Sequence, residues 1–446
     1  MRRIHQIREN ERVPLRWVVD YPAEGNSVGA LIEEILAKSE AIRRNLGLRE
    51  SPLGVLYGPD GPAIVTRGIV GVLELGGTQL EIVPKFTGHR PDSPNWRLGL
   101  LRMLARARRL AFDYTALRQI GEGEATLVDH LALAFAAILE SAYRGGPIVQ
   151  YQVSTERSPF LRGRLSVSEQ VLLLQKEPAL IVSEVAYLDP NNDLNRLLRW
   201  AGEALIARSM HPQVKRRLGL VVSQLPPLSI SGWRPLNLPA FIPGQFGDYR
   251  QAIEIAHTLA RGYGGGIESG RRDGYGYVLD MAEVFEGFIE RSLASTARSA
   301  LGGALVHVPQ HTALLAISLG QHAPIRTRPD NTLMEAGQVA IVIDAKYKDI
   351  SEADSARMRS PPSSDIYQLC GSMIAHRCRR GLLIYPSDHA GSRAAISYWT
   401  ADVQGVHLLI AAAAIDLSSV YTTEGIDTFD ENLGLVVAEV LAKVYE

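Results

Sequence analysis

The run VAIVIDAKYK, residues 339–348, constrains the fold of this chain more than any other segment, because it begins apolar and ends charged. A short apolar run of this kind is typical of a buried β-strand. Residues two apart in a strand share a face, so the carboxylate of Asp344 and the ammonium of Lys346 point the same way. The run therefore predicts a buried strand that delivers a carboxylate and an ammonium to one place.

A second carboxylate is expected beside this pair. Asp330 lies fourteen residues before Asp344, in another β-type segment that follows Pro329. Two carboxylates on adjacent strands, with a lysine beside one of them, suit phosphodiester cleavage. Hard oxygen ligands hold Mg²⁺, which polarises a phosphate and lowers the pKa of a bound water. The lysine would position that water and stabilise negative charge in the transition state. The alternative is that Asp-x-Lys is a surface ion pair, as it is in most sequences.

A helix predicted over residues 278–299 places one more acid near this site. Glu286 falls within the apolar stripe of the helix, between Ala282 and Ile289. A carboxylate in such a position is costly to bury unless it is paired or binds a metal. We therefore predict that Glu286 takes part in catalysis as a third metal ligand. The alternatives are an arginine partner or a position near solvent.

A second helix, predicted over residues 364–378, carries Gln368 beside a face of small residues, Gly371, Ser372 and Ala375. Such a face suits close approach to the catalytic strands, where the amide of Gln368 would reach a phosphate or the attacking water. The alternative is an amide that packs between helix and sheet. Basic residues near these motifs are predicted to bind DNA through its phosphates; they are Arg328, Lys348, Arg377, Arg379 and Arg380.

The order of helical and β-rich segments predicts a multidomain α/β (α+β) chain. Residues 71–86 are predicted as a hairpin that turns at Gly76-Gly77. After a glycine cluster at residues 262–276, the order α-β-β-β-α-β predicts a mixed sheet flanked by helices. We place the domain boundary in that cluster. It separates an N-terminal region of residues 1–265, with possible subdomains 1–120 and 121–265, from a catalytic domain of residues 266–446.

An arginine-rich helix is predicted in the N-terminal region. Between Arg97 and Arg118 the chain has six arginines and a single acid. These arginines would contact phosphate or an acidic protein partner. The alternative is a solvated helix face.

The composition argues against several classes of protein. The 446 residues carry a formal net charge of −1, so contact with nucleic acid has to come from local patches. Cys370 and Cys378 show no CxxC spacing and fit a reduced cytoplasmic protein without a zinc site. No apolar run has the length of a membrane span or the position of a signal peptide. Without a GxxxxGK[ST] motif, the chain is not expected to hydrolyse nucleotides itself.

The chain resembles the McrC family, the nuclease component of McrBC-type 5-methylcytosine restriction systems. The resemblance covers most of the chain. It runs through GVLELGGTQLEIVPKF (71–86), YRGGPIVQYQVSTERSPFLRGRLSV (143–167), VAYLDPNNDLNRLLRWA (185–201), LDMAEVFEGFIE (279–290), RPDNTL (328–333), VIDAKYK (342–348), DIYQL (365–369) and LLIYP (382–386). The last four stretches form a nuclease signature of the PD-(D/E)XK type. The polar Asn331 and Thr332 after Pro-Asp depart mildly from the family pattern.

This resemblance implies that Asp330, Asp344 and Lys346 carry Mg²⁺-dependent cleavage of DNA, with Glu286 and Gln368 in supporting roles. It also implies an N-terminal region that docks into the pore of a McrB-like AAA+ GTPase hexamer and stimulates GTP hydrolysis. The GTPase would read the modified base. Such a chain is the endonuclease subunit of a modification-dependent (type IV) restriction complex, and self-association through its catalytic domain is left open.

Two alternatives differ from this hypothesis. The first is a stand-alone PD-(D/E)XK nuclease, against which the large N-terminal portion argues. The second is a non-catalytic regulatory subunit of an NTPase ring, against which the intact set of two aspartates and a lysine argues.

Overall fold

The computed structural model describes residues 4–18, 28–86, 96–114, 117, 125–227, 242, 244–262, 276–299, 304–318, 322–350, 358–387, 394–403, 405–422 and 425–443. The chain divides into two compact units. The first comprises Met1–His130, Gly262–Gly266 and Asp273–Glu446, and the second comprises Leu131–Arg261 and Ile267–Arg272. The boundary predicted at residue 265 does not coincide with this division, because the first 130 residues fold together with the C-terminal segment.

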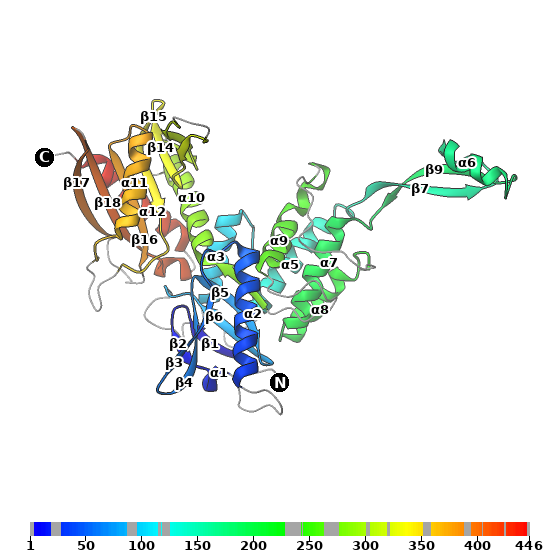
Figure 1. Cartoon of the computed structure of the whole chain (residues 1–446), viewed down its shortest axis with the longest axis horizontal. Coiled ribbons are helices and arrows are strands. Elements are labelled where there is room, and N and C mark those ends of the chain that lie inside the picture. Colours follow the sequence, from blue (N-terminus) through cyan, green and yellow to red (C-terminus); the bar gives the residue numbers. More distant parts are fainter. Residues whose placement is uncertain are drawn as a thin grey trace. The chain divides into compact units, whose positions relative to one another are not determined.

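Two small sheets and three helices form the N-terminal part of the first unit (Figure 1). The four-stranded sheet has the order β1 (Ile4–Arg8), β6 (Thr78–Val83), β5 (Ile69–Leu75) and β10 (Gly276–Asp280), and the three-stranded sheet has the order β2 (Arg12–Pro14), β4 (Gly61–Thr66) and β3 (Leu53–Gly58). The helices are α1 (Leu15–Val18), α2 (Val28–Leu46) and α3 (Trp96–Arg108). Gly76 and Gly77, between β5 and β6, have φ values of 55° and 79°. The predicted hairpin is therefore confirmed, with its turn at the glycine pair.

Strand β10 departs from the prediction, which placed a helix over residues 278–299. The structure has β10 followed by α10 (Met281–Ser299). β10 pairs antiparallel with β5, with Asp280 opposite Ile69, and this ladder satisfies its backbone hydrogen-bonding groups. Gly276 has a φ of 135°, and a Cβ there would lie 2.1 Å from the carbonyl oxygen of Val72. Glycine is required for this approach, so the last residue of the glycine cluster belongs to the sheet of the first unit.

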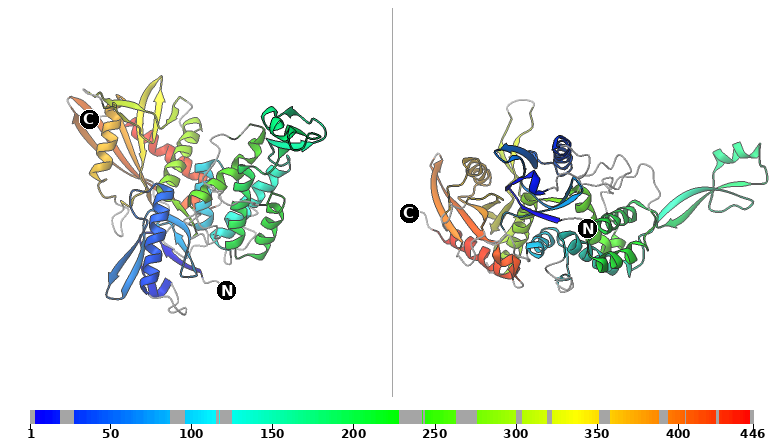
Figure 2. Two further views of the ribbon diagram at one scale, coloured as in Figure 1. Left: turned by 45° about the vertical axis from the view of Figure 1, so that its right-hand side comes forward. Right: turned by 90° about the horizontal axis from the view of Figure 1, so that it is seen from below.

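A six-stranded mixed sheet forms the C-terminal part of the first unit. Its order is β11 (Val306–Pro309), β14 (Asn331–Glu335), β15 (Gln338–Ala345), β16 (Arg380–Ser387), β18 (Val406–Asp416) and β17 (Ala395–Val403). The pairs β15–β16 and β16–β18 are parallel, and the others are antiparallel. Helix α11 (Ser363–Ala375) covers one face, while α10 and α12 (Gly425–Ala442) cover the other (Figures 1 and 2). The predicted mixed sheet flanked by helices is thus confirmed.

Smaller elements complete the first unit. β12 (Ala313–Ala316) and β13 (Ile325–Thr327) form a separate pair that contacts α11, and the 3-10 helix η3 (Ser418–Tyr421) precedes α12. None of the helices in the described ranges combines the length and the apolar character needed to cross a bilayer.

The second unit contains helices and one long hairpin. The helices are α5 (Leu127–Tyr143), which begins in the first unit, α7 (Asp193–Arg208), α8 (Pro212–Val222) and α9 (Arg250–Gly262), which follows the 3-10 helix η1 (Gly244–Tyr249). In the hairpin, β7 (Gln150–Ser158) pairs with β9 (Ile181–Asp189), and β8 (Arg164–Leu165) and α6 (Val167–Leu174) lie between them in sequence (Figure 1). Asn192 caps the start of α7, because its side chain accepts a hydrogen bond from the N–H of Asn195 at 3.0 Å.

Four arginines of α3 form ion pairs or hydrogen bonds within the first unit. Their partners lie on four other elements, namely β6, η3, α12 and α10. The pairs are Arg97 with Glu81, Arg102 with the carbonyl oxygen of Val420, Arg106 with Asp430, and Arg108 with Glu283. Arg118 lies outside the described residues. These four side chains therefore bind other elements of the first unit, three of them in its C-terminal segment. They do not have the role predicted for them, which was contact with phosphate or with a protein partner.

Removing one of these internal pairs should destabilise the fold. Arg106 lies 2.5 Å from Asp430, whose side chain is 11% exposed and whose pKa is raised by burial. Arg106→Met keeps most of the apolar stem but leaves that carboxylate without its cation, which should cost about 1–3 kcal/mol. Thermal unfolding measures the loss. Arg44→Met is the control, because the Arg44 side chain is 69% exposed and its loss should change little. Equal midpoints for the two variants would contradict the internal role.

Candidate active site

Two aspartates meet where β14 begins and β15 ends. The antiparallel register places Asn331 opposite Ile343, so Asp330 comes beside Asp344. The N–H of Asp330 donates to Oδ1 of Asp344 at 3.0 Å, and the N–H of Ala345 donates to Oδ2 of Asp330 at 2.9 Å. Each carboxylate is thus held by the backbone of the other strand, and the structure brings together the two acids that the sequence singled out.

Lys346 completes this pair. Its Nζ lies 3.6 Å from Oδ2 of Asp344 and 3.9 Å from Oδ2 of Asp330. Burial lowers the pKa of the lysine, but the negative charges of Asp344 and Asp330 oppose burial, and the net shift is upward. The side chain is 13% exposed. Lys346 is therefore a protonated cation at neutral pH, held between two carboxylates.

Two further acids approach from α10. Burial raises the pKa of Glu286 to about 7, and the charge of Asp330 adds to the shift. Burial, followed by the charge of Asp344, raises the pKa of Asp330 to about 6, and Glu290 contributes to the same shift. Glu290 follows Glu286 by one helical turn and was missed in the sequence, although the spacing of four was visible. The helix therefore adds negative charge to the two aspartates.

A divalent cation fits the two aspartates. Asp344 is fully buried, and its Oδ2 has no hydrogen-bond partner. Mg²⁺ prefers carboxylate oxygens, and it usually takes one or two of them together with waters and phosphate oxygens. Over the described ranges, no three acidic, histidine or cysteine side chains are grouped closely enough to bind one metal ion. The structure therefore offers Asp330 and Asp344 as ligands and does not bring Glu286 into a three-ligand group with them.

Helix α11 contributes a residue other than the predicted one. Gln368 is exposed on this helix, whereas Asp365, one turn earlier, is buried. Asp365 accepts hydrogen bonds from Nζ of Lys348 at 2.6 Å and from the hydroxyl of Tyr385 at 2.9 Å. Sequence reasoning missed Asp365 and Tyr385, although both lie in the stretches DIYQL and LLIYP that carried the family resemblance.

The basic candidates are spread over a wider area than predicted. Lys348 is bonded to Asp365, and Arg328 is exposed and donates to the side chain of Gln310. The segment 376–380 was predicted to lie close to the site. However, the parallel register sets Gly381 opposite Val342, which puts Arg380 roughly 16 Å from Lys346 along the strand direction. Arg377 and Arg379 are exposed at that opposite end of β15, so the predicted closeness is wrong for this segment.

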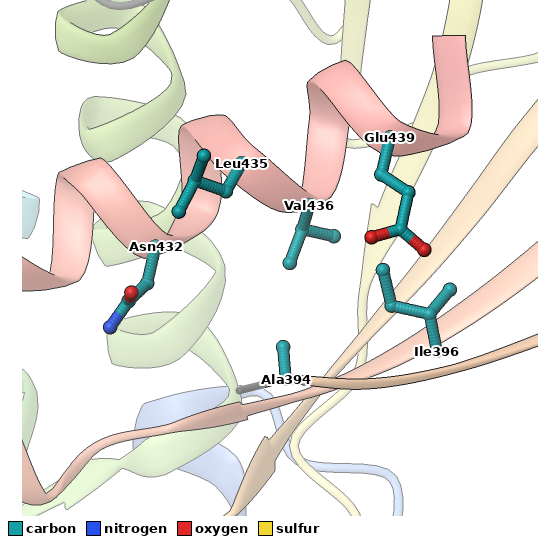
Figure 3. Close-up of a pocket in the computed structure, with 6 residues that line it drawn as sticks. All are labelled: Ala394, Ile396, Asn432, Leu435, Val436 and Glu439. Atoms are coloured by element: carbon teal, nitrogen blue, oxygen red, sulfur yellow. The ribbon is translucent and has the colours of Figure 1, made fainter. Parts of the chain in front are cut away.

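The structure also has a small pocket between β17 and α12 (Figure 3). Its lining residues are Ala394, Ile396, Asn432, Leu435, Val436 and Glu439. β17 is the edge strand, three strands from β15. The pocket is therefore separate from the aspartates.

Known proteins resemble this chain as follows. A family model described as McrBC 5-methylcytosine restriction system component matches residues 64–386. A solved chain from the assembly of Thermococcus gammatolerans McrB AAA+ hexamers with bound McrC has a TM-score of 0.65 and 19% identity, over 97% of this chain and 100% of that chain. A chain of the Thermococcus gammatolerans McrBC complex has a TM-score of 0.47 and 20% identity, over 66% of this chain and 88% of that chain. The comparison with curated proteins gave no significant match.

The crowded carboxylates predict how stability depends on pH and Mg²⁺. The pKa of Glu286 rises from 4.5 to about 7 in the folded protein, and that of Asp330 rises from 3.8 to about 6. The folded protein thus retains protons that the unfolded chain releases. The raised pKa values of Glu286 and Asp330 therefore stabilise the fold below pH 4, and this stabilisation is lost as the pH rises through about 7.

Thermal midpoints with EDTA and with Mg²⁺ test this expectation. Mg²⁺ binds the ionised carboxylates, so it should raise the midpoint more at about pH 7.5 than at about pH 5. In EDTA, Glu286→Gln should weaken the dependence on pH between these values. A Mg²⁺ effect of equal size at both pH values would argue against a carboxylate metal site.

Proposed function

Because the chain belongs to the family of McrBC 5-methylcytosine restriction system components, we propose that it is the nuclease subunit of such a system and cleaves DNA in a Mg²⁺-dependent reaction. The match covers 323 of the 446 residues, from 64 to 386, and agrees with the resemblance predicted from the sequence. The observation that carries the proposal is the geometry of Asp330, Asp344 and Lys346. Two aspartates held by reciprocal backbone bonds share one lysine, whose side chain is 13% exposed.

Each residue of the site has a separate task in this proposal. Asp330 and Asp344 would hold Mg²⁺, which when bound polarises the scissile phosphate and activates water. Lys346 stays protonated, so it stabilises the negative charge that develops on the phosphate instead of accepting a proton. Glu286 has a pKa of about 7 and is suited to accept the proton of the attacking water near neutral pH.

Basic side chains would hold the DNA backbone around this centre. Lys348 and Arg328 lie next to the aspartates in sequence, and exposed Arg377 and Arg379 lie at the far end of β15. A DNA duplex is long enough to contact both groups, since it carries a phosphate about every 3.4 Å along each strand. In this proposal, Asp365 holds the ammonium of Lys348 in place.

The proposed partner is a ring of AAA+ GTPase subunits whose GTP hydrolysis the chain stimulates. The solved assembly with a similar fold contains McrB AAA+ hexamers with bound McrC. In the present chain, the hairpin β7–β9 of the second unit exposes a series of large apolar side chains, which is typical of a protein-binding surface. They are Tyr151, Val153, Phe160, Leu161, Val167, Val171 and Leu172. We propose that the hairpin enters the ring.

Loss of one metal ligand should abolish cleavage without loss of the fold. Asp344→Asn keeps the shape of the side chain but removes the charge that binds Mg²⁺. The cleavage rate of methylated DNA, with the GTPase partner, GTP and Mg²⁺ present, should fall about a hundredfold or more. Asp402→Asn is the matched control, because the Asp402 side chain is 52% exposed. Cleavage by Asp344→Asn at the rate of Asp402→Asn would refute the assignment.

Stimulation of the partner should depend on the hairpin and not on the aspartates. A charge placed in an apolar contact is costly to bury, so Phe160→Asp and Leu172→Asp should weaken stimulation of GTP hydrolysis strongly. Tyr57→Asp is the control, since Tyr57 is equally exposed (73%) but lies on β3 in the first unit. Asp344→Asn should stimulate normally. Undiminished stimulation by both hairpin variants would exclude this docking site.

A further inference from the structure

Tyr347 lies between the two lysines of the candidate site, and it is held by residues from the start of the chain. The ring is buried, and its hydroxyl donates to Oε2 of Glu9 at 3.0 Å. The Glu9 side chain is fully buried, and its backbone N–H continues the contact of β1 with β6 by bonding to the carbonyl oxygen of Val83 at 2.9 Å. A hydrogen bond across 338 positions in sequence thus joins the four-stranded sheet to the segment that carries Lys346.

Lys85 holds the same tyrosine in two further ways. Its Nζ donates to the carbonyl oxygen of Tyr347 at 3.3 Å and lies 4.3 Å from the centre of the Tyr347 ring. The same Nζ lies 3.7 Å from Oε1 of Glu9. The hydroxyl, the ring and the backbone of Tyr347 are therefore all fixed by one buried acid and one lysine.

The Glu9 carboxylate accepts three hydrogen bonds besides its ion pair with Lys85. Its Oε1 accepts the N–H of Gly68 at 3.1 Å, and its Oε2 accepts the N–H of Lys85 at 3.4 Å in addition to the tyrosine hydroxyl. Burial raises the pKa of Glu9, and the charge of Lys85 opposes that shift. A buried carboxylate with this many donors is rigid, since releasing any one of them would leave a polar group unsatisfied.

The ring of Tyr347 also contacts the helix that carries Glu286. Its centre lies 5.8 Å from that of Phe285 on α10 and 5.3 Å from that of Phe86. Phe285 directly precedes Glu286 in the sequence. The buried side chain next to Lys346 thus contacts the helix that carries Glu286.

Lys346 needs such an anchor because the strand ends before it. The pairing of β15 with β16 stops at Ala345 opposite Ile384, and the N–H of Lys346 makes one more bond, to the carbonyl oxygen of Ile384 at 2.8 Å. Beyond this point the chain leaves the sheet. A catalytic group has to be held within about 0.5 Å of its working position, which a segment beyond the end of a strand does not provide by itself.

We propose that Glu9, Lys85 and Tyr347 form a positioning clamp that holds the Lys346 ammonium beside Asp330 and Asp344. The proposal rests on the proposed nuclease function. In the clamp, Glu9 and Lys85 fix Tyr347 in place. The neighbouring Lys346 is thereby directed to the carboxylates of Asp330 and Asp344. The catalytic centre therefore depends on residues 9 and 85, which lie far outside the predicted catalytic domain of residues 266–446.

Tyr347→Phe tests the clamp in the full chain, because it removes one hydroxyl and keeps the ring. The expected result is a fall in the maximal cleavage rate of about ten- to a hundredfold. The Mg²⁺ concentration for half-maximal rate, DNA affinity and GTPase stimulation should stay unchanged. Tyr398→Phe is the matched control, since the Tyr398 hydroxyl also donates to a carboxylate, Glu439, at 3.0 Å, but does so on β17 and α12. Glu9→Gln keeps an acceptor for the Tyr347 hydroxyl, so it should cleave DNA at a higher maximal rate than Glu9→Ala.

A second measurement does not depend on cleavage. The rate at which an amine reagent labels Lys346, followed by mass spectrometry, should rise in Tyr347→Phe and stay at the wild-type value in Tyr398→Phe. Wild-type cleavage and wild-type labelling in Tyr347→Phe would overturn the clamp. If wild-type protein cuts no DNA while labelling rises in Tyr347→Phe, the proposed nuclease function fails and the clamp stands.

Discussion

The first unit is organised around two carboxylates that the backbone forces together. The pairing of β14 with β15 sets Asp330 beside Asp344, and each acid accepts a backbone N–H from the strand of the other. Burial raises the pKa of Asp330 to about 6, and the negative charge of Asp344 adds to the shift because like charges close together repel. Apolar side chains would stabilise the end of β15 better. Such an arrangement is characteristic of a functional site rather than of a core.

Four buried acids elsewhere in the described part of this unit each lie beside a cation of their own. The pairs are Glu9 with Lys85, Glu81 with Arg97, Asp365 with Lys348, and Asp430 with Arg106. At the end of β15, by contrast, Asp330 and Asp344 share Lys346. Each of these four acids thus has one cation to itself, whereas the two aspartates at the end of β15 have one between them. This difference supports the proposed Mg²⁺ site.

The sequence predicted the features that depend on local pattern. The apolar run before Asp344 predicted a buried strand, and Gly76-Gly77 predicted the hairpin turn; both are present. These features depend on residues close together in the chain, so periodicity and turn chemistry were sufficient to find them.

The sequence could not predict the features that depend on distant pairing. Residues 278–280 were assigned to a helix because nothing nearby in the sequence shows that β5 pairs with them. The arginines of α3 resembled a phosphate-binding face because their acidic partners lie up to 324 positions away, as for Arg106 and Asp430. The link from Glu9 to Tyr347 is equally remote. Apart from the two aspartates on neighbouring strands, the residues around the site come together through contacts between distant parts of the chain.

These long-range contacts also determine how function can be divided along the chain. A truncation near residue 265 would remove β10 from its partner β5 and would leave the backbone groups of β5 unpaired along that edge. It would also deprive helix α3 of the C-terminal elements that it packs against, including Asp430 and Glu283. The proposed docking hairpin and the proposed catalytic site therefore lie in different units but not in separable segments of sequence. The second unit is an insertion between two halves of the first, so single substitutions, rather than truncations, are the changes that can separate the two functions.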